Sequence, residues 1–323
     1  RWRMSRIKND TDLFPEWSIA FDAKMFTWKK FAAAVNIASA PTGLIIPPSG
    51  ILIIYPVLAG CSVVGMIMSG YIPGLMWALA CMVVAYVIAK KNHYPTAGKV
   101  PASVFFKYFV DAIPSLLLIV IIVGGVMSGI FTATESAAVA VAYTLFLSIV
   151  VYRSIKIKDL PKILLDACET TAVIMFLIAG SNVMSFVMSF TGLPSAIGNA
   201  LISVSSNKYV ILLIINLVLL VVGCFMDITP AVLIFTPIFL PVVQSFGMDP
   251  IHFGIMMVMN LGIGNITPPV GSALFSGCSV ADMDMEDMIK PVLPFYAAIF
   301  VALMLVAYVP WFSMALPTLF GAV

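Results

Sequence analysis

Oxygen-bearing residues gather in two short, proline-rich blocks of an otherwise apolar chain. The blocks are APTGLIIPPSG at residues 40–50 and GNITPPVG at residues 264–271. Each proline lacks a backbone N–H, so neither block can continue a regular helix, and carbonyl oxygens lose their helical partners. Four side-chain oxygens accompany these carbonyls, on Thr42, Ser49, Asn265 and Thr267. A small hard cation such as sodium requires oxygen ligands of this kind, which makes both blocks candidate cation sites.

A second interpretation is that the prolines only kink packed helices. One isolated block would favour that interpretation. Two blocks in corresponding positions of a repeat, described below, favour a binding role.

The composition places both blocks in a membrane. Hydrophobic residues make up 62% of the 323 residues and charged residues only 10%, which is more apolar surface than a soluble fold can cover. A spanning helix needs about 20 mostly apolar residues, and the sequence has about eight such segments plus one hairpin-like stretch. We therefore expect an all-α, polytopic transmembrane bundle in the lipid bilayer. The net charge of +2 gives no reason to expect a nucleic-acid partner.

The blocks interrupt two of the expected spans, at residues 32–68 and 251–280. Uninterrupted spans are expected at residues 71–89, 113–131, 137–151, 160–190 and 292–316. At membrane depth, irregular backbone is costly unless it is buried in protein or lines a wet cavity. The interruptions are therefore expected to be functional.

A third polar element is MDITP at residues 226–230, in the middle of the apolar stretch 209–243. This pattern predicts a re-entrant helical hairpin with Asp227 at its turn. An ionisable side chain at membrane depth is a functional candidate because its burial is costly. If the hairpin is shallow, Asp227 is instead a solvated helix cap before Thr229 and Pro230. The sequence leaves both interpretations open.

Basic residues give the bundle an orientation. They cluster in the stretch up to Lys30, in residues 90–107 and in residues 153–162. Short loops rich in Lys and Arg stay on the cytoplasmic side, so these connections are expected to face inward. The hairpin then enters from outside, the second interrupted span runs from outside to inside, and the first runs the opposite way.

The two interrupted spans, which run in opposite directions, lead into segments of similar sequence. Residues 60–87 can be laid over residues 277–309 with small gaps, and both segments begin with GCSV and end near AYV. Each follows a PPxG block. The chain therefore contains an inverted repeat, a common plan of secondary transporters.

The sequence lacks the residues that metal, redox or nucleotide chemistry would need. The two histidines, His93 and His252, are too few for a metalloenzyme, and five single cysteines form no metal or redox motif. A phosphate-binding loop of the GxxxxGK[ST] type is absent. Glu135 in TATES fits a helix cap with Thr132 or Thr134, and the acidic residues of 282–287 fit a solvated face. We do not expect an enzyme.

Five blocks carry a resemblance to a known family. In chain order they are GLIIPPSG, SGYIPGL, GIFTATESAAVAV, MDITPAVLIFTPIFLPV and NLGIGNITPPVG. From about residue 31 onward the chain resembles the large membrane subunit of tripartite ATP-independent periplasmic (TRAP) transporters. The resemblance implies an elevator-type transporter of the bacterial inner membrane, with Na⁺ as coupling ion. It also implies three partners: a small TRAP membrane subunit, a periplasmic substrate-binding protein, and an organic-acid substrate such as a dicarboxylate or the sugar acid sialic acid.

The resemblance also implies where ion and substrate meet. The expected cation ligands lie in the two proline blocks: Thr42, Gly43, Ser49, Gly264, Asn265, Thr267 and Pro268. The expected substrate contacts lie at the hairpin turn and at the prolines: Asp227, Thr229, Pro47 and Pro269.

The start of the chain departs from the family pattern. Members have further spans and a cytoplasm-facing hairpin before the first PPxG block, whereas residues 1–30 are largely polar and are left unassigned. Either the chain is a fragment or its first repeat is truncated, and the first cation site then lacks part of its ligands. We predict the rest of the first repeat at residues 31–90, a cytoplasmic interfacial arm at 91–112, and the second repeat at 113–323, with a hairpin at 209–245 and an interrupted helix at 251–280.

Two alternatives to a TRAP subunit remain open. One is a self-sufficient, ion-coupled carboxylate symporter that needs no soluble partner. The other is a membrane scaffold that has lost transport.

Overall fold

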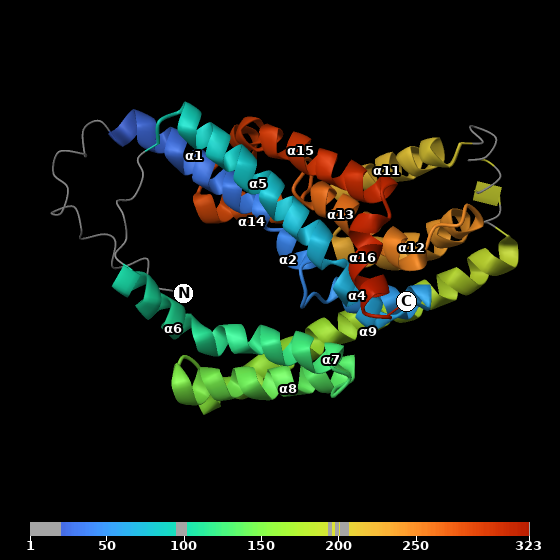
Figure 1. Ribbon diagram of the computed structural model, residues 1–323, viewed down its shortest axis with the longest axis horizontal. Helices are drawn as coiled ribbons and strands as arrows, with labels where there is room; N and C mark the ends of the chain where they lie inside the picture. Colours follow the sequence, from blue (N-terminus) through green and yellow to red (C-terminus); the bar gives the residue numbers. More distant parts are fainter. Residues whose placement is uncertain (1–20, 95–101, 193–195, 198–199, 201–206, 323) are drawn as a thin grey trace.

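The computed structural model describes residues 21–94, 102–192, 196–197, 200 and 207–322, and these residues contain helices and no strand (Figure 1). In the first half the helices are α1 (Phe21–Ser39), α2 (Thr42–Ile45), α3 (Ile51–Ala59), α4 (Val63–Ser69), α5 (Tyr71–Lys91), α6 (Ala102–Ile119), α7 (Gly125–Met127) and α8 (Ala133–Phe146). In the second half they are α9 (Leu160–Thr191), α11 (Lys208–Phe225), α12 (Ile228–Ser245), α13 (Pro250–Asn265), α14 (Ser272–Ala281), α15 (Met285–Tyr308) and α16 (Trp311–Leu319).

The first interrupted span is broken three times. Helix α1 ends at Ser39, and the short α2 leads into the irregular residues 46–50 before α3 begins. A further break follows at Gly60, which has a φ of 64°, and Ser62 caps α4 by accepting a hydrogen bond from Gly65 N at 3.0 Å. The segment expected as two half-helices is therefore three pieces after α1.

Several boundaries differ from those expected from the sequence. Helix α1 begins at residue 21, ten residues before the first repeat was expected to begin, because no proline or glycine interrupts residues 21–40. Residues 102–112 of the expected interfacial arm form one continuous helix with the span that follows, and residues 95–101 of that arm lie outside the described part. The expected last span divides at Val309, because Pro310 cannot continue α15.

The second half contains a helical hairpin and the second break. Helices α11 and α12 are joined only by residues 226–227, so Asp227 lies at the tip of the hairpin. Helix α13 ends at Asn265, and α14 begins at Ser272 after the irregular residues 266–271. Each proline block also holds one cis peptide bond, Pro47–Pro48 and Pro268–Pro269.

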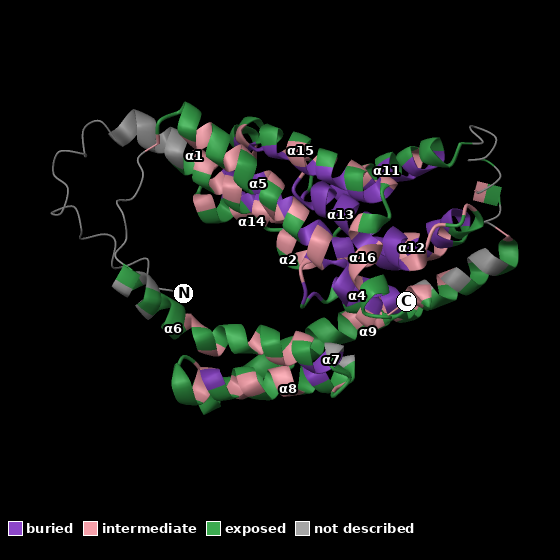
Figure 2. Ribbon diagram, viewed as in Figure 1, coloured by how far each residue is buried: buried purple, intermediate pink, exposed green. Residues whose placement is uncertain are grey.

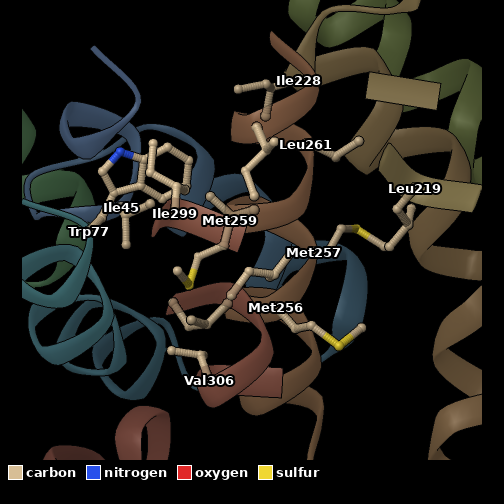
Figure 3. Packing of buried hydrophobic residues seen from close by; sticks show 14 of the residues in the cluster. Ile45, Trp77, Leu219, Ile228, Met256, Met257, Met259, Leu261, Ile299 and Val306 are labelled. Carbon is tan, nitrogen blue, oxygen red and sulfur yellow. The ribbon is translucent and has the colours of Figure 1, made fainter. Parts of the chain in front are cut away.

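The core is centred on α13, in which every residue from Ile251 to Asn265 is buried (Figure 2). Figure 3 shows Met256, Met257, Met259 and Leu261 of this helix between Trp77 and Ile45 on one side and Leu219 on the other. In a lipid environment helices gain little from burying apolar surface, so close van der Waals packing must hold such a core together. Glycines of α13 permit this closeness: an added Cβ at Gly254 would meet the ring of Tyr55, and one at Gly262 would lie 3.4 Å from Trp77.

A second part of the chain lies apart from this core. The helical segment from α6 to α7 and helix α8 form an antiparallel pair along one side of the molecule (Figure 1). Helix α9 packs against α12, where Gly180 and Pro230 line the same apolar cavity of about 210 Å³. The turn before α8 confirms the predicted cap: Thr132 and Glu135 form a reciprocal capping box, with Glu135 Oε2 accepting from Thr132 N at 2.8 Å.

Six helical segments among the described residues are long and apolar enough to cross a membrane. They are Val63–Lys91, Thr134–Val151, Ile157–Met184, Lys208–Phe225, Ile228–Ser245 and Met285–Tyr308. The number is below that expected from hydropathy alone for two reasons. The interrupted spans divide into shorter pieces, and the uninterrupted span expected at residues 113–131 is matched only by a shorter apolar helix, Tyr108–Gly124. The protein is a polytopic helical membrane protein.

Candidate functional site

The hairpin tip and the second break meet in the structure. Cys224, next to last in α11, accepts hydrogen bonds at its carbonyl from Val270 N at 3.2 Å and Gly271 N at 3.4 Å. Helices α11 and α13 cross at two glycines: a Cβ added to Gly223 would lie 3.1 Å from Gly264 Cα. Two segments about 40 residues apart in sequence are thus fixed to each other through backbone atoms.

Two carbonyl oxygens of the second break face one small space. A Cβ added to Gly271 would lie 2.7 Å from Thr267 O and 2.9 Å from Asn265 O, so only glycine permits this approach. Both oxygens therefore lie beside Gly271, in the irregular backbone between α13 and α14. The Thr267 hydroxyl donates its proton to Ile263 O at 2.6 Å. The lone pairs of Thr267 Oγ1 therefore remain available to accept a hydrogen bond or to bind a cation.

Ser272 connects this break to the hairpin tip. Its hydroxyl lies 2.5 Å from Asn265 Oδ1 and 3.2 Å from Asp227 Oδ1. A serine hydroxyl carries one hydrogen, so it can donate to only one of these oxygens at a time. The side chains of Asn265, Ser272 and Asp227 therefore form one polar group that joins α13, α14 and α12.

The ends of four helices give the site two kinds of partial charge. Helices α11 and α13 end here, and their last carbonyls carry partial negative charge. Helices α12 and α14 begin here, and neither N-cap residue, Asp227 or Gly271, uses a side chain to cap the first turn. Free N–H groups at a helix start attract anions, whereas carbonyl ends attract cations. One site can therefore hold a cation and a carboxylate close together.

The first break places its candidate ligands differently. Thr42 Oγ1 donates to Ser39 O at 2.5 Å and Ser49 Oγ donates to Leu44 O at 2.6 Å, so both hydroxyls bond within their own segment. Gly43 is exposed and Pro47 is buried. The break reaches α13 through Pro41, whose Cβ would lie 3.3 Å from a Cβ added at Gly262. It thus lies beside the helix that ends in the second break.

The remaining predicted residues surround the hairpin tip and second break. Thr229 is half-buried in the first turn of α12, and Gly264 is buried at the crossing with α11. Pro268 is half-buried and Pro269 is exposed. Asp227 does occupy the cap position of α12, but its exposed carboxylate accepts a hydrogen bond from Ser272 and none from that helix.

Sequence reasoning missed three participants. Ser272 follows PPVG directly, and its position at the start of a half-helix was the available signal. The other two are the carbonyl of Cys224 and the hydroxyl of Tyr296, which donates to Ile266 O. Both bond to residues distant in the sequence, so no local sequence pattern could predict them. A cavity of about 220 Å³ beside Lys208, Asp249 and His252 lies at the open end of the hairpin and contains none of the candidate residues.

The donor set fits sodium better than a transition metal. The described residues contain no group of three His, Cys, Asp or Glu side chains that could hold a metal ion. The second break instead offers carbonyl oxygens of Asn265 and Thr267 and the side-chain oxygens of Asn265, Thr267 and Ser272. Neutral oxygens from unwound helix ends are what sodium sites of transporters use.

Broken helices in repeat-related positions and a hairpin that reaches the middle of the bundle define a class: secondary transporters of the membrane. The chain belongs to the family of the tripartite ATP-independent periplasmic transporter, DctM component, whose model matches residues 24–312. Proteins of this family are transporter permeases and not enzymes.

Curated relatives agree with this assignment. The chain is 39% identical over 290 residues to the sialic acid TRAP transporter large permease SiaM of Vibrio cholerae, covering 90% of the chain and 68% of the relative. It is 37% identical over 291 residues to the C4-dicarboxylate TRAP transporter large permease DctM of Pseudomonas aeruginosa, with the same coverage of 90% and 68%. An uncharacterized protein of Salmonella typhimurium, YgiK, is 50% identical over 292 residues, or 90% of the chain and 67% of the relative. The chain thus spans about two thirds of the length of these relatives.

Proposed function

We propose that this chain is the large permease of a sodium-coupled TRAP transporter that imports an organic acid across the bacterial inner membrane. In this proposal a periplasmic binding protein delivers the acid and a small membrane subunit completes the transporter. The family supports the tripartite assembly. The chemistry of the second break supports the coupling ion.

One observation carries the proposal: the hairpin tip and the second break share a hydrogen-bonded group. The Cys224 carbonyl holds residues 270–271, and Ser272 lies between Asn265 and Asp227. Asn265 and Thr267 are the residues that would hold the sodium ion through oxygen atoms. When bound, the ion supplies a positive charge that attracts the carboxylate of the acid.

The chain's own groups would orient the acid. The starts of α12 and α14 lie close together, since Ser272 reaches Asp227, and free N–H groups at helix starts suit a carboxylate. Asp227 would repel an anion unless Ser272 or the substrate's own hydroxyl groups donate to it. This arrangement favours an acid with a carboxylate and further hydroxyl groups that can donate to Asp227. Relatives are named for sialic acid and for C4-dicarboxylates.

Uptake by the complete transporter in proteoliposomes tests the function. We expect accumulation of labelled sialic acid or succinate under an inward sodium gradient with the binding protein present, and none when potassium replaces sodium. Equal uptake in potassium would contradict sodium coupling.

The same assay separates the alternatives. Uptake without the binding protein would indicate a self-sufficient symporter. A complex that binds its partners but carries no acid under any gradient would indicate a scaffold.

A further inference from the structure

The hydroxyl of Tyr296 reaches the second break from a neighbouring helix. Tyr296 lies in α15 and donates a hydrogen bond to the carbonyl of Ile266. Ile266 is the C-cap of α13, with φ of −102° and ψ of 2°, so it is the residue at which helical geometry ends. The tyrosine therefore holds the chain where the helix unwinds.

The held carbonyl lies between the two that face the candidate cation position. The oxygens of Asn265 and Thr267 face Gly271, whereas the oxygen of Ile266 is occupied by the tyrosine. Consecutive peptide units share an α-carbon, so fixing the middle one restricts how the two on either side can rotate. The tyrosine also keeps Ile266 O from turning into the site as an additional ligand.

The first repeat contains a similar arrangement. Trp77 of α5, the helix that corresponds to α15, donates from Nε1 to Ala38 O at 2.9 Å, three residues before Pro41. Ile266 precedes Pro268 by two residues. In both repeats an aromatic side chain of the helix after the break thus donates to a backbone carbonyl near that break. The two carbonyls are not at equivalent positions, because the counterpart of Pro268 is Pro47 and Ala38 lies nine residues before it. The buried indole of Trp77 also packs on α13 at Gly262.

We propose that Tyr296 is a positioning residue that sets the affinity and selectivity of the cation site by holding the Ile266 carbonyl. The inference rests on the proposed sodium coupling and adds a residue outside both proline blocks. A substitution that removes only the hydroxyl should leave the fold intact, because the ring continues to fill its place on α15.

Thermal unfolding of the purified permease complex provides a test that needs no transported acid. The unfolding temperature is followed as sodium chloride replaces potassium chloride at constant ionic strength, and again with lithium chloride. For Tyr296→Phe we expect the half-effective sodium concentration to rise about threefold to tenfold, as loss of one hydrogen bond implies. We also expect the preference for sodium over lithium to fall, because Ile266 O becomes free to move.

Tyr308→Phe is the matched control. Tyr308 lies on the same helix and donates to Tyr209 O at 3.2 Å, away from the break. Its half-effective sodium concentration and its sodium preference should equal those of the wild type. Replacing Tyr296 by p-aminophenylalanine, whose N–H is a weaker donor, should give a half-effective sodium concentration between those of the wild type and Tyr296→Phe.

The outcomes separate the inference from the function on which it rests. If sodium does not stabilise the wild-type complex more than potassium does, the proposed coupling is wrong. If sodium stabilises the wild type and Tyr296→Phe responds identically, the proposed role of Tyr296 is wrong and the proposed sodium coupling stands. If Tyr296→Phe does not fold, the p-aminophenylalanine variant decides: a raised half-effective sodium concentration supports the inference, and an unchanged one overturns it.

Discussion

Gly223 and Gly264 face each other where the hairpin arm α11 crosses α13, and the contact is made by backbone atoms. A Cβ added to Gly264 would lie 2.9 Å from Cys224 N and closer still to Gly223. The neighbouring atoms belong to the main chain, which cannot rotate away as a side chain can. The position of the hairpin tip against the second break therefore depends on the absence of two side chains.

At this residue we expect Gly264→Ala to destabilise the permease by about 1 to 3 kcal/mol, the usual cost of forcing extra volume into a packed site. The unfolding temperature of the purified complex measures the effect. Gly180→Ala in α9 is the control, because a Cβ there meets nothing within 4 Å and alanine favours helix. Equal stability of both variants would show that α11 and α13 do not approach as closely as described.

The sequence predicted the site's residues unevenly. Proline and oxygen-bearing residues could be recognised because each changes backbone bonding at its own position. Tyr296 and the Cys224 carbonyl could not, because a tyrosine in an apolar span and a backbone oxygen have the same local pattern whether or not they bond to a distant segment. Ser272 is intermediate, since its place after PPVG marked a helix start but not its partners.

At the scale of elements, a buried polar pair joins the hairpin to α13. Asn260 donates from Nδ2 to Asn216 O at 2.9 Å and to Asn216 Oδ1 at 2.6 Å, and both side chains are buried. Asn260 Oδ1 has no hydrogen-bond partner within the described part of the chain. Hydrogen bonds from side-chain amides between membrane helices stabilise their packing, so this pair should hold α11 against α13 as one unit.

For this pair we expect Asn260→Ala to loosen α11. Amide hydrogen exchange in residues 208–225 should become about threefold faster, corresponding to the modest strength of such bonds in membranes. Thr236→Val is the control, because Thr236 is also buried but its hydroxyl makes a long 3.5 Å interaction with Met257 Sδ of α13 in place of a bond to an amide. An unchanged rate of amide hydrogen exchange in Asn260→Ala would contradict the proposed role of the Asn216–Asn260 pair.

Helix boundaries were less predictable than helix existence. Hydropathy identified the apolar segments, but it could not place the break at Gly60 or the early start of α1, since both depend on local backbone geometry within an apolar or mixed stretch. The reciprocal cap of Thr132 and Glu135 was predictable because its pattern is local and specific.

At the scale of the whole molecule, the middle of α1 meets the start of α15 and the end of α5 at one side. Lys30 of α1 pairs with Asp287 of α15 at 2.9 Å, and Phe31 packs on Tyr94 after α5 at a ring distance of 5.0 Å. Lys90 and Lys91 end α5 at the same side. Helices α1 and α13 run in opposite directions in Figure 1, the arrangement that the inverted repeat requires. From the basic residues we propose that this side faces the cytoplasm and that the open end of the hairpin faces outside.

The repeat could be found in the sequence because GCSV and AYV mark the ends of its aligned segments. The contact of the hairpin tip with the second break was implied only by the family resemblance and not by the residues themselves. That contact depends on how α11 and α13 cross, and the crossing depends on glycines that are common throughout membrane helices. The overall plan was thus visible in the sequence, and the joining of hairpin and break required the structure.

Binding of radioactive sodium to the purified complex tests most directly whether the hairpin tip and second break form a cation site. We expect saturable binding that excess sodium displaces and potassium does not, and an affinity lower by about tenfold or more in Asn265→Ala, because a ligand to a bound charge is lost. Asn92→Ala, at the exposed end of α5, should bind as the wild type does. Sodium affinity that is the same in Asn265→Ala as in the wild type would contradict the account.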